Sequence, residues 1–270
     1  MAPAKSHITH PPCSLQLKAI ALGVACAAGI HPLQVAAQNE TAVIEELVVW
    51  GRSLQLLGSA DSASQGVVGY ADFSTRPLAR VGELVEVVPG MIATQHSGPG
   101  KANQYFLRGF NLDHGSDFST FFDGMPVNFR THAHAQGYMD LNFIIPEIIE
   151  RVDFKKGPYS ANTGDFSLAG TSSMKTYDTL ERGFVEVTAG SGNEIRVVVA
   201  DSFSTEQGSL LYALEHQQTN GMFVLDQDVR KYNGLLKYTG EIGGIPSQLT
   251  LTAYDSEWIS TNQVPQRAVA

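Results

Sequence analysis

The hydrophobic and polar positions divide this 270-residue chain into four regions. An apolar run over residues 19–30 is followed by a stretch, 38–66, rich in Gln, Ser, Ala and Gly. Residues 67–176 mix helical and extended patterns, and apolar and polar positions alternate through much of 177–270. The pattern predicts a leader, a mobile tether, a compact α+β domain with a small mixed sheet, and a set of antiparallel strands.

Within residues 67–176 the apolar spacing predicts one helix and several short strands. Leu78 to Val88 has apolar residues at helical spacing, and Pro89-Gly90 ends the run. We expect short strands at Tyr105–Arg108, Phe118–Phe122 and Val152–Phe154. Asp123-Gly124 is typical of a tight turn leading into Met125-Pro126-Val127.

Alternation in the last region predicts about four to five strands over residues 177–270. The alternating segments are 184–190, 194–200, 209–215, 235–239 and 247–254. A soluble β-sandwich and transmembrane β-strands both have this pattern. The leader and the domain that precede the strands favour the transmembrane interpretation.

The leader, residues 1–37, has the features of an export signal. Lys5 and Lys18 flank a polar lead ahead of the apolar run, and the run is too short to span a bilayer. Val35-Ala36-Ala37 offers compact residues for a signal peptidase, so we expect cleavage after Ala37. Cys26 would suit a lipoprotein signal, but Gly23 stands where such a signal has Leu.

Cysteine usage and charge narrow the function classes. Cys13 and Cys26 both lie in the leader, so the mature chain is expected to have neither a disulfide nor a thiol nucleophile. The formal net charge is −9, and no run of Lys and Arg occurs, which argues against a nucleic-acid partner. No apolar segment of helix-spanning length follows the leader, so insertion into a membrane would require β-strands.

An octet in the tether has the composition of a free strand. Its apolar centre has strong extended propensity, its acidic pair keeps it soluble, and a glycine ends it. An unpaired strand of this kind is a template for β-augmentation by a partner. The octet consists of Glu45, Glu46, Leu47, Val48, Val49, Trp50, Gly51 and Arg52.

Four further motifs occur one after another within residues 67–176, a stretch of about 110 residues. They lie at residues 80–91, 106–110, 122–127 and 145–160. Together they resemble the plug domain of TonB-dependent outer-membrane receptors, and the octet resembles the TonB box of that family. One departure is Thr171-Ser172-Ser173-Met174, which stands where the family has a Gly-Gly-Val step.

The resemblance implies an energy-coupled receptor for a scarce nutrient, such as a ferric siderophore or another metal complex. It implies a TonB-type energy transducer, the outer membrane of a Gram-negative bacterium and a small-molecule or metal-complex ligand as partners, with neither enzymatic activity nor a resident cofactor. A barrel of about 22 strands needs on the order of 400 residues, many more than follow Leu180. The chain is therefore expected to be a fragment with a truncated barrel.

The motifs of this resemblance supply candidate structural residues. Glycines permit positive φ or close backbone approach, and proline fixes φ. Arg108, Glu150 and Arg151 would form the charged network by which the plug lies in its barrel, or would otherwise be ordinary surface ion pairs. The full set is Arg108, Gly109, Asp123, Gly124, Glu150, Arg151, Gly157 and Pro158.

Two loops, residues 111–116 and 128–140, are candidates for the ligand site because they are rich in His and Asp. The His-X-His pair at 132 and 134 would place both imidazoles on one face of a strand, at a spacing that metal sites use. A polar loop without metal is the alternative, and Phe129 and Tyr138 would suit a bulky organic chelate. The candidate ligand or metal residues are Asp113, His114, His132, His134 and Tyr138, with Asp117 and Asp140 nearby.

A second function class remains open at this point. The His and Asp loops would also suit a periplasmic metal-binding module or a metal-dependent enzyme whose strands form a small sandwich. An amidohydrolase would need two later histidines, and only His216 follows.

Overall fold

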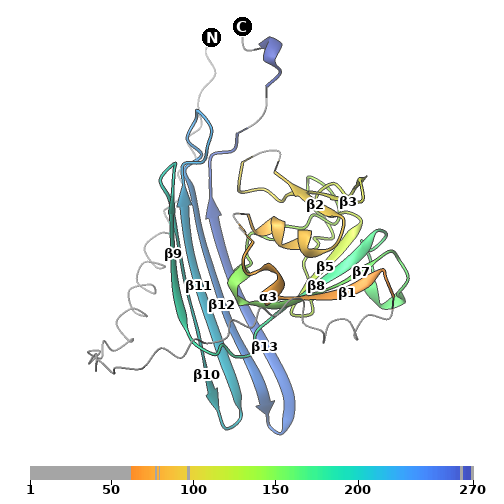
Figure 1. Cartoon of the computed structure of the whole chain (residues 1–270), viewed down its shortest axis with the longest axis vertical. Coiled ribbons are helices and arrows are strands. Elements are labelled where there is room, and N and C mark those ends of the chain that lie inside the picture. Colours follow the sequence, from red (N-terminus) through yellow and green to blue (C-terminus); the bar gives the residue numbers. More distant parts are fainter. Residues whose placement is uncertain (1–61, 77, 79, 96–97, 262–263, 269–270) are drawn as a thin grey trace, which may run out of the picture. The chain divides into compact units, whose positions relative to one another are not determined.

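A computed structural model describes residues 62–76, 78, 80–95, 98–261 and 264–268. The predicted leader (1–37), most of the tether and the octet at 45–52 lie outside these residues. The described chain contains three sheets (Figure 1). The first two lie between residues 65 and 176, which we call the mixed domain. The third follows it, and we call it the meander.

The mixed domain has a five-stranded sheet in the order β1-β7-β8-β5-β6. Its strands are β1 (Gln65–Gly69), β5 (Phe118–Phe122), β6 (Met125–Pro126), β7 (Ile149–Lys156) and β8 (Gly170–Thr176). β5 and β8 run parallel, and the other neighbours are antiparallel. A smaller sheet joins β2 (Met91–Thr94), β3 (Gln104–Leu107) and β4 (Phe110–Asn111). The only α-helix described is α3 (Tyr70–Phe73), and short 3-10 helices lie at η1 (Val81–Val87), η2 (Pro146–Ile148) and η3 (Ala161–Thr163).

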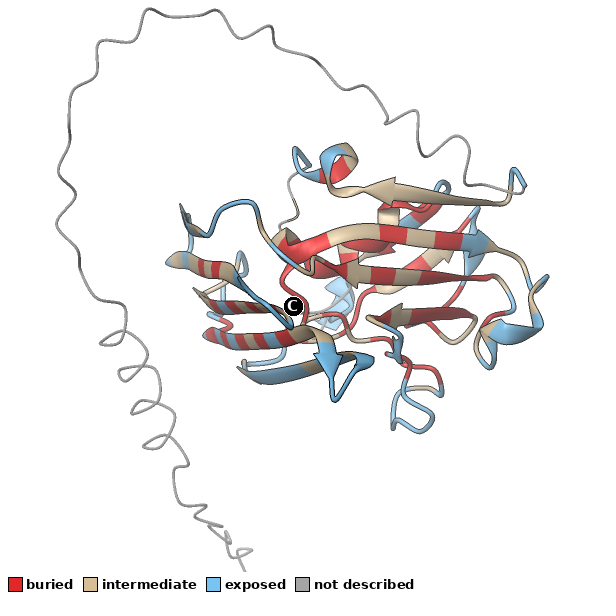
Figure 2. Cartoon of the chain, turned by 90° about the horizontal axis from the view of Figure 1, so that it is seen from below, coloured by how far each residue is buried: buried red, intermediate tan, exposed pale blue. Residues whose placement is uncertain are grey.

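Apolar side chains from both sheets form one buried core, and buried positions recur along the strands in Figure 2. Burial of this apolar surface is the main favourable contribution to folding of the domain. The largest fully buried side chains include Phe73, Leu84, Tyr105, Phe118, Phe122 and Ile148.

The predicted helix Leu78–Val88 is shorter and tighter than its sequence pattern indicated. Its described residues form η1, a 3-10 helix that begins at Val81. The predicted apolar face of this segment is confirmed, since Val81, Leu84, Val85 and Val88 are all buried. β-Branched valines are weak α-helix formers, and Pro89 prevents extension beyond Val88, so tertiary packing rather than helix propensity determines this segment.

The predicted strands and turns of the mixed domain are largely confirmed. β5 has the predicted bounds, while β3 ends one residue early because Arg108 and Gly109, at φ 52° and 82°, form the turn to β4. Asp123 and Gly124 also have positive φ, 47° and 84°, as a two-residue hairpin turn requires. β1 begins at Gln65, two residues inside the stretch predicted as tether, and pairs with β7. The Thr171–Met174 departure lies within β8, which pairs regularly with β5.

The meander consists of five antiparallel strands in the order β13-β12-β11-β10-β9. They are β9 (Phe184–Gly190), β10 (Glu194–Thr205), β11 (Gly208–Thr219), β12 (Val229–Ile242) and β13 (Ile245–Glu257). The sheet is not closed, and within the described residues no strand pairs with the outer edge of β9 or of β13. A last 3-10 turn, η4 (Gln266–Ala268), follows.

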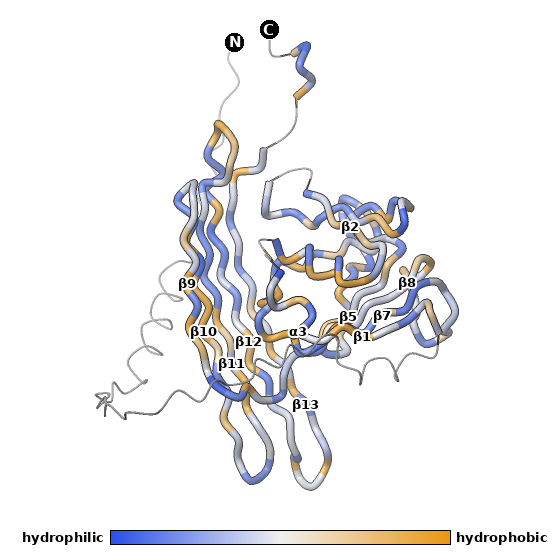
Figure 3. Tube along the Cα trace, viewed as in Figure 1, coloured by the Kyte–Doolittle hydropathy of each residue, from blue (hydrophilic) through white to orange (hydrophobic). Residues whose placement is uncertain are grey.

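The two faces of the meander differ, because successive side chains of a strand alternate between faces. On β12, Val229, Lys231, Asn233, Leu235 and Lys237 are all buried. The opposite face exposes apolar side chains, and Figure 3 shows hydrophobic and hydrophilic positions interspersed along these strands. We call this opposite face the outer face; it includes Val185, Val187, Leu214, Leu236, Leu249 and Leu251.

None of the helices described here is long and apolar enough to cross a membrane.

Candidate functional site

Aromatic and imidazole rings gather in the loop that connects β6 to η2. Phe129 and Tyr138 form an isolated antiparallel bridge, which closes the loop between them. The His132 ring stacks on the Tyr138 ring, with centroids 3.9 Å apart and planes 16° apart. The Phe129 ring lies nearly parallel to Tyr138, at 8° and 6.4 Å. We call Phe129, His132, His134, Tyr138 and His114 the ring cluster.

Two members of the ring cluster are buried and fixed by the backbone of residues 102–103. The Nδ1 atom of His114 lies 3.1 Å and 3.0 Å from the carbonyl oxygens of Ala102 and Asn103, so it carries the proton and donates. The Tyr138 hydroxyl accepts a hydrogen bond from the Ala102 N–H at 2.8 Å. Burial raises the pKa of Tyr138, so this phenol stays neutral.

The predicted strand placement of His132 and His134 is wrong, because this segment is irregular. The backbone N–H of His134 donates to Nδ1 of His132 at 3.1 Å, so the loop curls back on itself. The His134 ring meets His114 edge to face, with centroids 4.4 Å apart. Among the described residues no group of three or more His, Cys, Asp or Glu is arranged to hold a metal ion. The structure thus brings the predicted histidines together as a stack of rings rather than as a ligand set.

The predicted acidic residues surround the ring cluster without joining it. Asp113 is half exposed and its Oδ1 lies 3.8 Å from Nε2 of His114. Asp117 accepts a hydrogen bond from the Ser116 hydroxyl. Asp140 accepts hydrogen bonds from the backbone and side-chain amides of Asn142, and burial is the main cause that raises the pKa of its carboxyl.

Asn128 holds the base of the ring-bearing loop, a role that no sequence motif indicated. Its side-chain amide lies 3.0 Å from the carbonyl oxygens of Gly115, Phe118 and Gly137. Its Oδ1 accepts the N–H of Thr120 at 2.7 Å. Because the residue is buried, these hydrogen bonds tie the loop rigidly to the start of β5.

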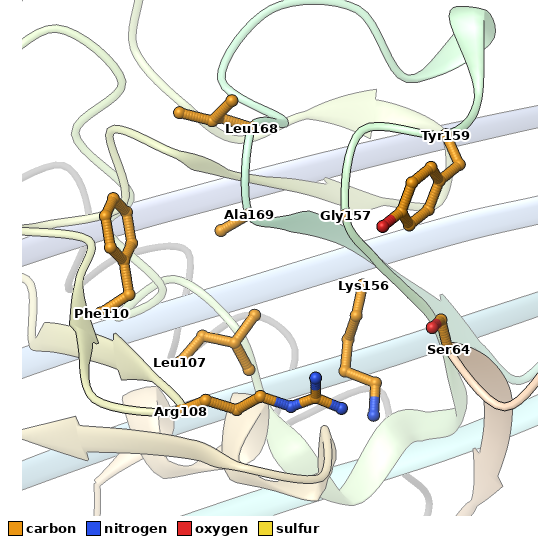
Figure 4. A pocket seen from close by; sticks show the side chains of 9 residues that line it. All are labelled: Ser64, Leu107, Arg108, Phe110, Lys156, Gly157, Tyr159, Leu168 and Ala169. Atoms are coloured by element: carbon orange, nitrogen blue, oxygen red, sulfur yellow. The ribbon is translucent and has the colours of Figure 1, made fainter.

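The Arg108 motif residue lies beside a cavity of about 380 Å³ (Figure 4). Arg108 packs over Gly90, and its side chain points toward that of Lys156 in the figure. The pKa of Lys156 is lowered, mainly because burial removes water from its ammonium group and secondly because the positive charge of Arg108 lies nearby. The cavity therefore brings two cations together. It is lined by Ser64, Leu107, Arg108, Phe110, Lys156, Gly157, Tyr159, Leu168 and Ala169.

The remaining motif residues have local roles. Gly157, at φ 89°, follows Lys156, and a side chain there would meet the Tyr159 ring. Pro158 comes next in this turn. Arg151 pairs with Glu150 at 3.3 Å and with Asp153 at 3.2 Å, all partly exposed on β7. Such exposed pairs contribute little to stability.

One charged contact between the mixed domain and the meander comes from residues that no sequence motif indicated. The Arg196 guanidinium binds both carboxylate oxygens of Glu147, at 2.6 Å and 2.9 Å. It also donates to Glu215 at 2.6 Å, and Glu215 is further bound by Lys231 at 3.2 Å and Asn233 at 2.6 Å. These charged residues lie on the buried face of strands whose sequence alternates. That position in the alternation is the signal by which the sequence could have identified them.

A second contact of this kind surrounds Lys237. Its buried ammonium donates to the Thr176 carbonyl at 3.0 Å and lies 2.8 Å from Asp178. Asp123 lies 3.7 Å away and accepts hydrogen bonds from the Thr176 amide and hydroxyl. The Asp123-Gly124 turn is thus joined to the end of β8 and, through Lys237, to β12.

Comparison with known proteins supports the family. The family model described as TonB-dependent Receptor Plug Domain matches residues 59–171. The vitamin B12 transporter BtuB of Vibrio vulnificus (strain CMCP6) is 25% identical over 212 residues, which cover 77% of this chain and 33% of the relative.

Solved structures share the fold. The copper transporter OprC superposes with a TM-score of 0.54 at 18% identity, covering 75% of this chain and 32% of OprC. A variant of the ferric enterobactin receptor PfeA from Pseudomonas aeruginosa, in complex with enterobactin, gives a TM-score of 0.51 at 16% identity, covering 72% and 33%. The chain spans about a third of the length of these proteins. Residues 59–171 are thus a plug domain of the kind found in TonB-dependent receptors, and an antiparallel sheet that is not closed follows them.

Proposed function

We propose that this chain serves in the energy-coupled uptake of a scarce nutrient across the outer membrane of a Gram-negative bacterium. A ferric siderophore or another metal complex binds, a TonB-type transducer engages residues 45–52, and the mixed domain rearranges to let the ligand pass. No bond of the ligand is made or broken. The signal at residues 1–37 directs export and is removed after Ala37. The observation that carries the proposal is a plug domain bound by buried ion pairs to strands whose outer face is apolar.

The names of the matched proteins support this class of cargo without selecting one. They are a transporter of vitamin B12, a transporter of copper and a receptor for ferric enterobactin. Among the described residues no group of three or more His, Cys, Asp or Glu is placed to hold a metal ion, so none of them favours the alternative metal-dependent enzyme. No nucleic-acid partner is proposed.

The outer face of the meander supports the membrane location. It exposes Leu249 and Leu251 at 54% and 55%, in line with other apolar residues on neighbouring strands. Exposed apolar surface of this extent is unfavourable in water and favourable against lipid. The buried polar residues of β12 lie on the opposite face, as expected for the inside of a barrel.

Leu251→Lys is expected to weaken insertion of the chain into lipid vesicles. A cation on the lipid face near the bilayer centre costs about 2–4 kcal/mol, a factor of about 30 or more in partition. The measurement is the fraction of purified chain that floats with the vesicles in a density gradient. Gln248→Lys is the matched control on the other face of β13, and its fraction should equal that of the wild type. Equal flotation of both variants would contradict the lipid-facing assignment.

The transducer contact is testable with a proline in the octet. Val48→Pro removes a backbone donor from the proposed strand pairing, so binding of the periplasmic transducer domain should fall by at least about tenfold. A pull-down with the mature chain measures this. Gln55→Pro, outside the octet, is the control and should bind normally. If Val48→Pro binds as well as Gln55→Pro, strand pairing at the octet is excluded.

We further propose that Arg108, with Lys156, receives a carboxylate supplied by another part of the receptor. Two converging cations are stabilised by an anion, and arginine binds carboxylates in a bidentate manner. With this contact Arg108 keeps the role expected of it, binding of the plug to the barrel, and Lys156 shares that role.

A further inference from the structure

A cavity of about 320 Å³ lies on the face of the five-stranded sheet that is turned away from the core. Val152, Phe154 and Met174 are buried in the core, so the residues next to them along β7 and β8 point to the opposite face. The cavity reaches across β1, β7, β8 and β5, and η3 forms its rim. Its volume is at the lower end of the range for small-molecule sites, about 300–1,000 Å³.

Polar side chains from neighbouring strands line this cavity side by side. Lys155 of β7 is paired with Gln65 of β1 and with Thr171 of β8. Ser173, further along β8, is paired with Phe121 of β5. Paired residues of neighbouring strands lie on the same face of a sheet, so an ammonium, an amide, two hydroxyls and an aromatic ring meet here.

The polar groups of this cavity have no partner within the described part of the protein. The side chains of Gln65, Lys155, Thr171 and Ser173 make neither a hydrogen bond nor an ion pair with any described residue. Thr171 is only 7% exposed, and a hydroxyl buried to this extent costs free energy if it lacks a partner. A polar ligand in the cavity would supply that partner.

The charges beside the cavity argue against a simple ion as the ligand. Asp153 also lines it, and its carboxylate accepts a hydrogen bond from Arg151 at 3.2 Å. A bare anion would be repelled by Asp153, and a bare cation by Lys155. Hydroxyls and amides both donate and accept, which suits a neutral ligand with several hydroxyl groups, and the Phe121 ring suits the apolar face of a sugar ring.

The rim at η3 is held by its own hydrogen bonds. The Thr163 hydroxyl lies 2.7 Å from the Ser160 carbonyl oxygen and 3.1 Å from the Ser167 hydroxyl, close enough to donate to either. The Ser167 hydroxyl in turn donates to the Gly164 carbonyl at 2.7 Å. A rim that is ordered in advance loses little conformational entropy when a ligand binds.

We propose that this cavity binds a small neutral saccharide, a monosaccharide or a disaccharide. Phe121 packs against the apolar face of a sugar ring, while Gln65, Lys155 and Thr171 form hydrogen bonds with its hydroxyl groups. The inference goes beyond the proposed uptake function, because the site shares no residue with the ring cluster or the octet.

A ligand-observed NMR titration of the full mature chain in detergent micelles tests this proposal. The probes are maltose, lactose and chitobiose, with citrate as an anionic comparison. At least one of the sugars is expected to bind, and citrate is not. Thr171→Val, which replaces the hydroxyl by a methyl group, and Lys155→Met should each weaken sugar binding about threefold to tenfold. Thr188→Val, exposed on β9, is the matched control and should bind as the wild type does.

The stability of Thr171→Val separates a ligand site from a structural role. Because the hydroxyl has no partner among the described residues, its removal breaks no hydrogen bond, and urea unfolding should show no loss of stability. A variant that is clearly less stable than the wild type would show that the hydroxyl serves the fold and would contradict its role in the site. Lys155 is exposed, so Lys155→Met tests binding without disturbing the core.

Several outcomes of the titration would overturn the proposal. These are no binding of any of the sugars, binding of citrate as tight as that of the best sugar, or wild-type affinity in both Thr171→Val and Lys155→Met. A longer maltodextrin should bind no more tightly than maltose, because the cavity is small. Tighter binding of the maltodextrin would point to a glycan chain and would overturn the assignment to a small saccharide.

Discussion

Glu215→Gln is expected to lower the free energy of unfolding by about 3–5 kcal/mol. The carboxylate is fully buried between Arg196 and Lys231. Glutamine has nearly the same size but no charge, so Lys231 is left as a buried cation with no anion bound to it, while Arg196 keeps Glu147. Urea unfolding in detergent micelles, followed by far-UV circular dichroism, measures the loss.

Two companion variants make this result specific. Glu186→Gln, exposed on β9, should change stability by less than about 0.5 kcal/mol. The double variant Glu215→Gln with Lys231→Met should recover much of the loss, because replacing both members of a buried ion pair is far less costly than removing one. A single Glu215→Gln variant within about 1 kcal/mol of the wild type would show that the buried pair does not stabilise the fold.

Asn128→Ala is expected to be nearly as disruptive, with a loss of about 3 kcal/mol. The change removes the acceptor of the Thr120 N–H and the donor to the carbonyl oxygens of Gly115, Phe118 and Gly137 in a buried region. Gly115 keeps the Phe118 N–H as a donor, and each group that is left unsatisfied costs about 1–3 kcal/mol unless water replaces the amide. Unfolding by urea measures the stability. Near-UV circular dichroism should report loss of the ordered Tyr138 environment.

Asn162→Ala provides the control for this variant, because Asn162 is exposed in η3. It should leave both signals unchanged. If Asn128→Ala loses less than about 1 kcal/mol and keeps its near-UV spectrum, Asn128 does not position the ring-bearing loop.

The strands of this protein follow from sequence more closely than its helix does. Alternation identified all five strands of the meander, because every second side chain of a strand lies on the same face, and one face of this sheet is buried. The start of β12 was missed, since Asn233-Gly234 has the composition of a hairpin turn. In the structure Gly234 pairs with both Leu214 and Ala253, so pairing on both sides overrides the local turn preference.

The candidate site was predictable only in part, because it depends on contacts between distant segments. The loops rich in His and Asp were predicted as the ligand site, and the structure places rings of the two loops side by side, His114 with His134 and Tyr138. Nothing local indicated that His114 would lie beneath His134, or that the Ala102 backbone would anchor Tyr138. The hydrogen bond from the His134 N–H to Nδ1 of His132 also requires the folded loop, so the sequence alone could not predict it.

In the membrane location that we propose, the connections of the meander indicate which way the protein faces. Two-residue turns join β10 to β11 and β12 to β13, whereas residues 220–228 form a longer loop between β11 and β12. Asp178, in the link from the mixed domain, bonds to Ser209 and Thr239 beside the short turns. In outer-membrane barrels the short turns face the periplasm and the long loops face outward. The exposed apolar side chains from Met222 to Leu225 would then project from the cell surface, within reach of antibodies and phages.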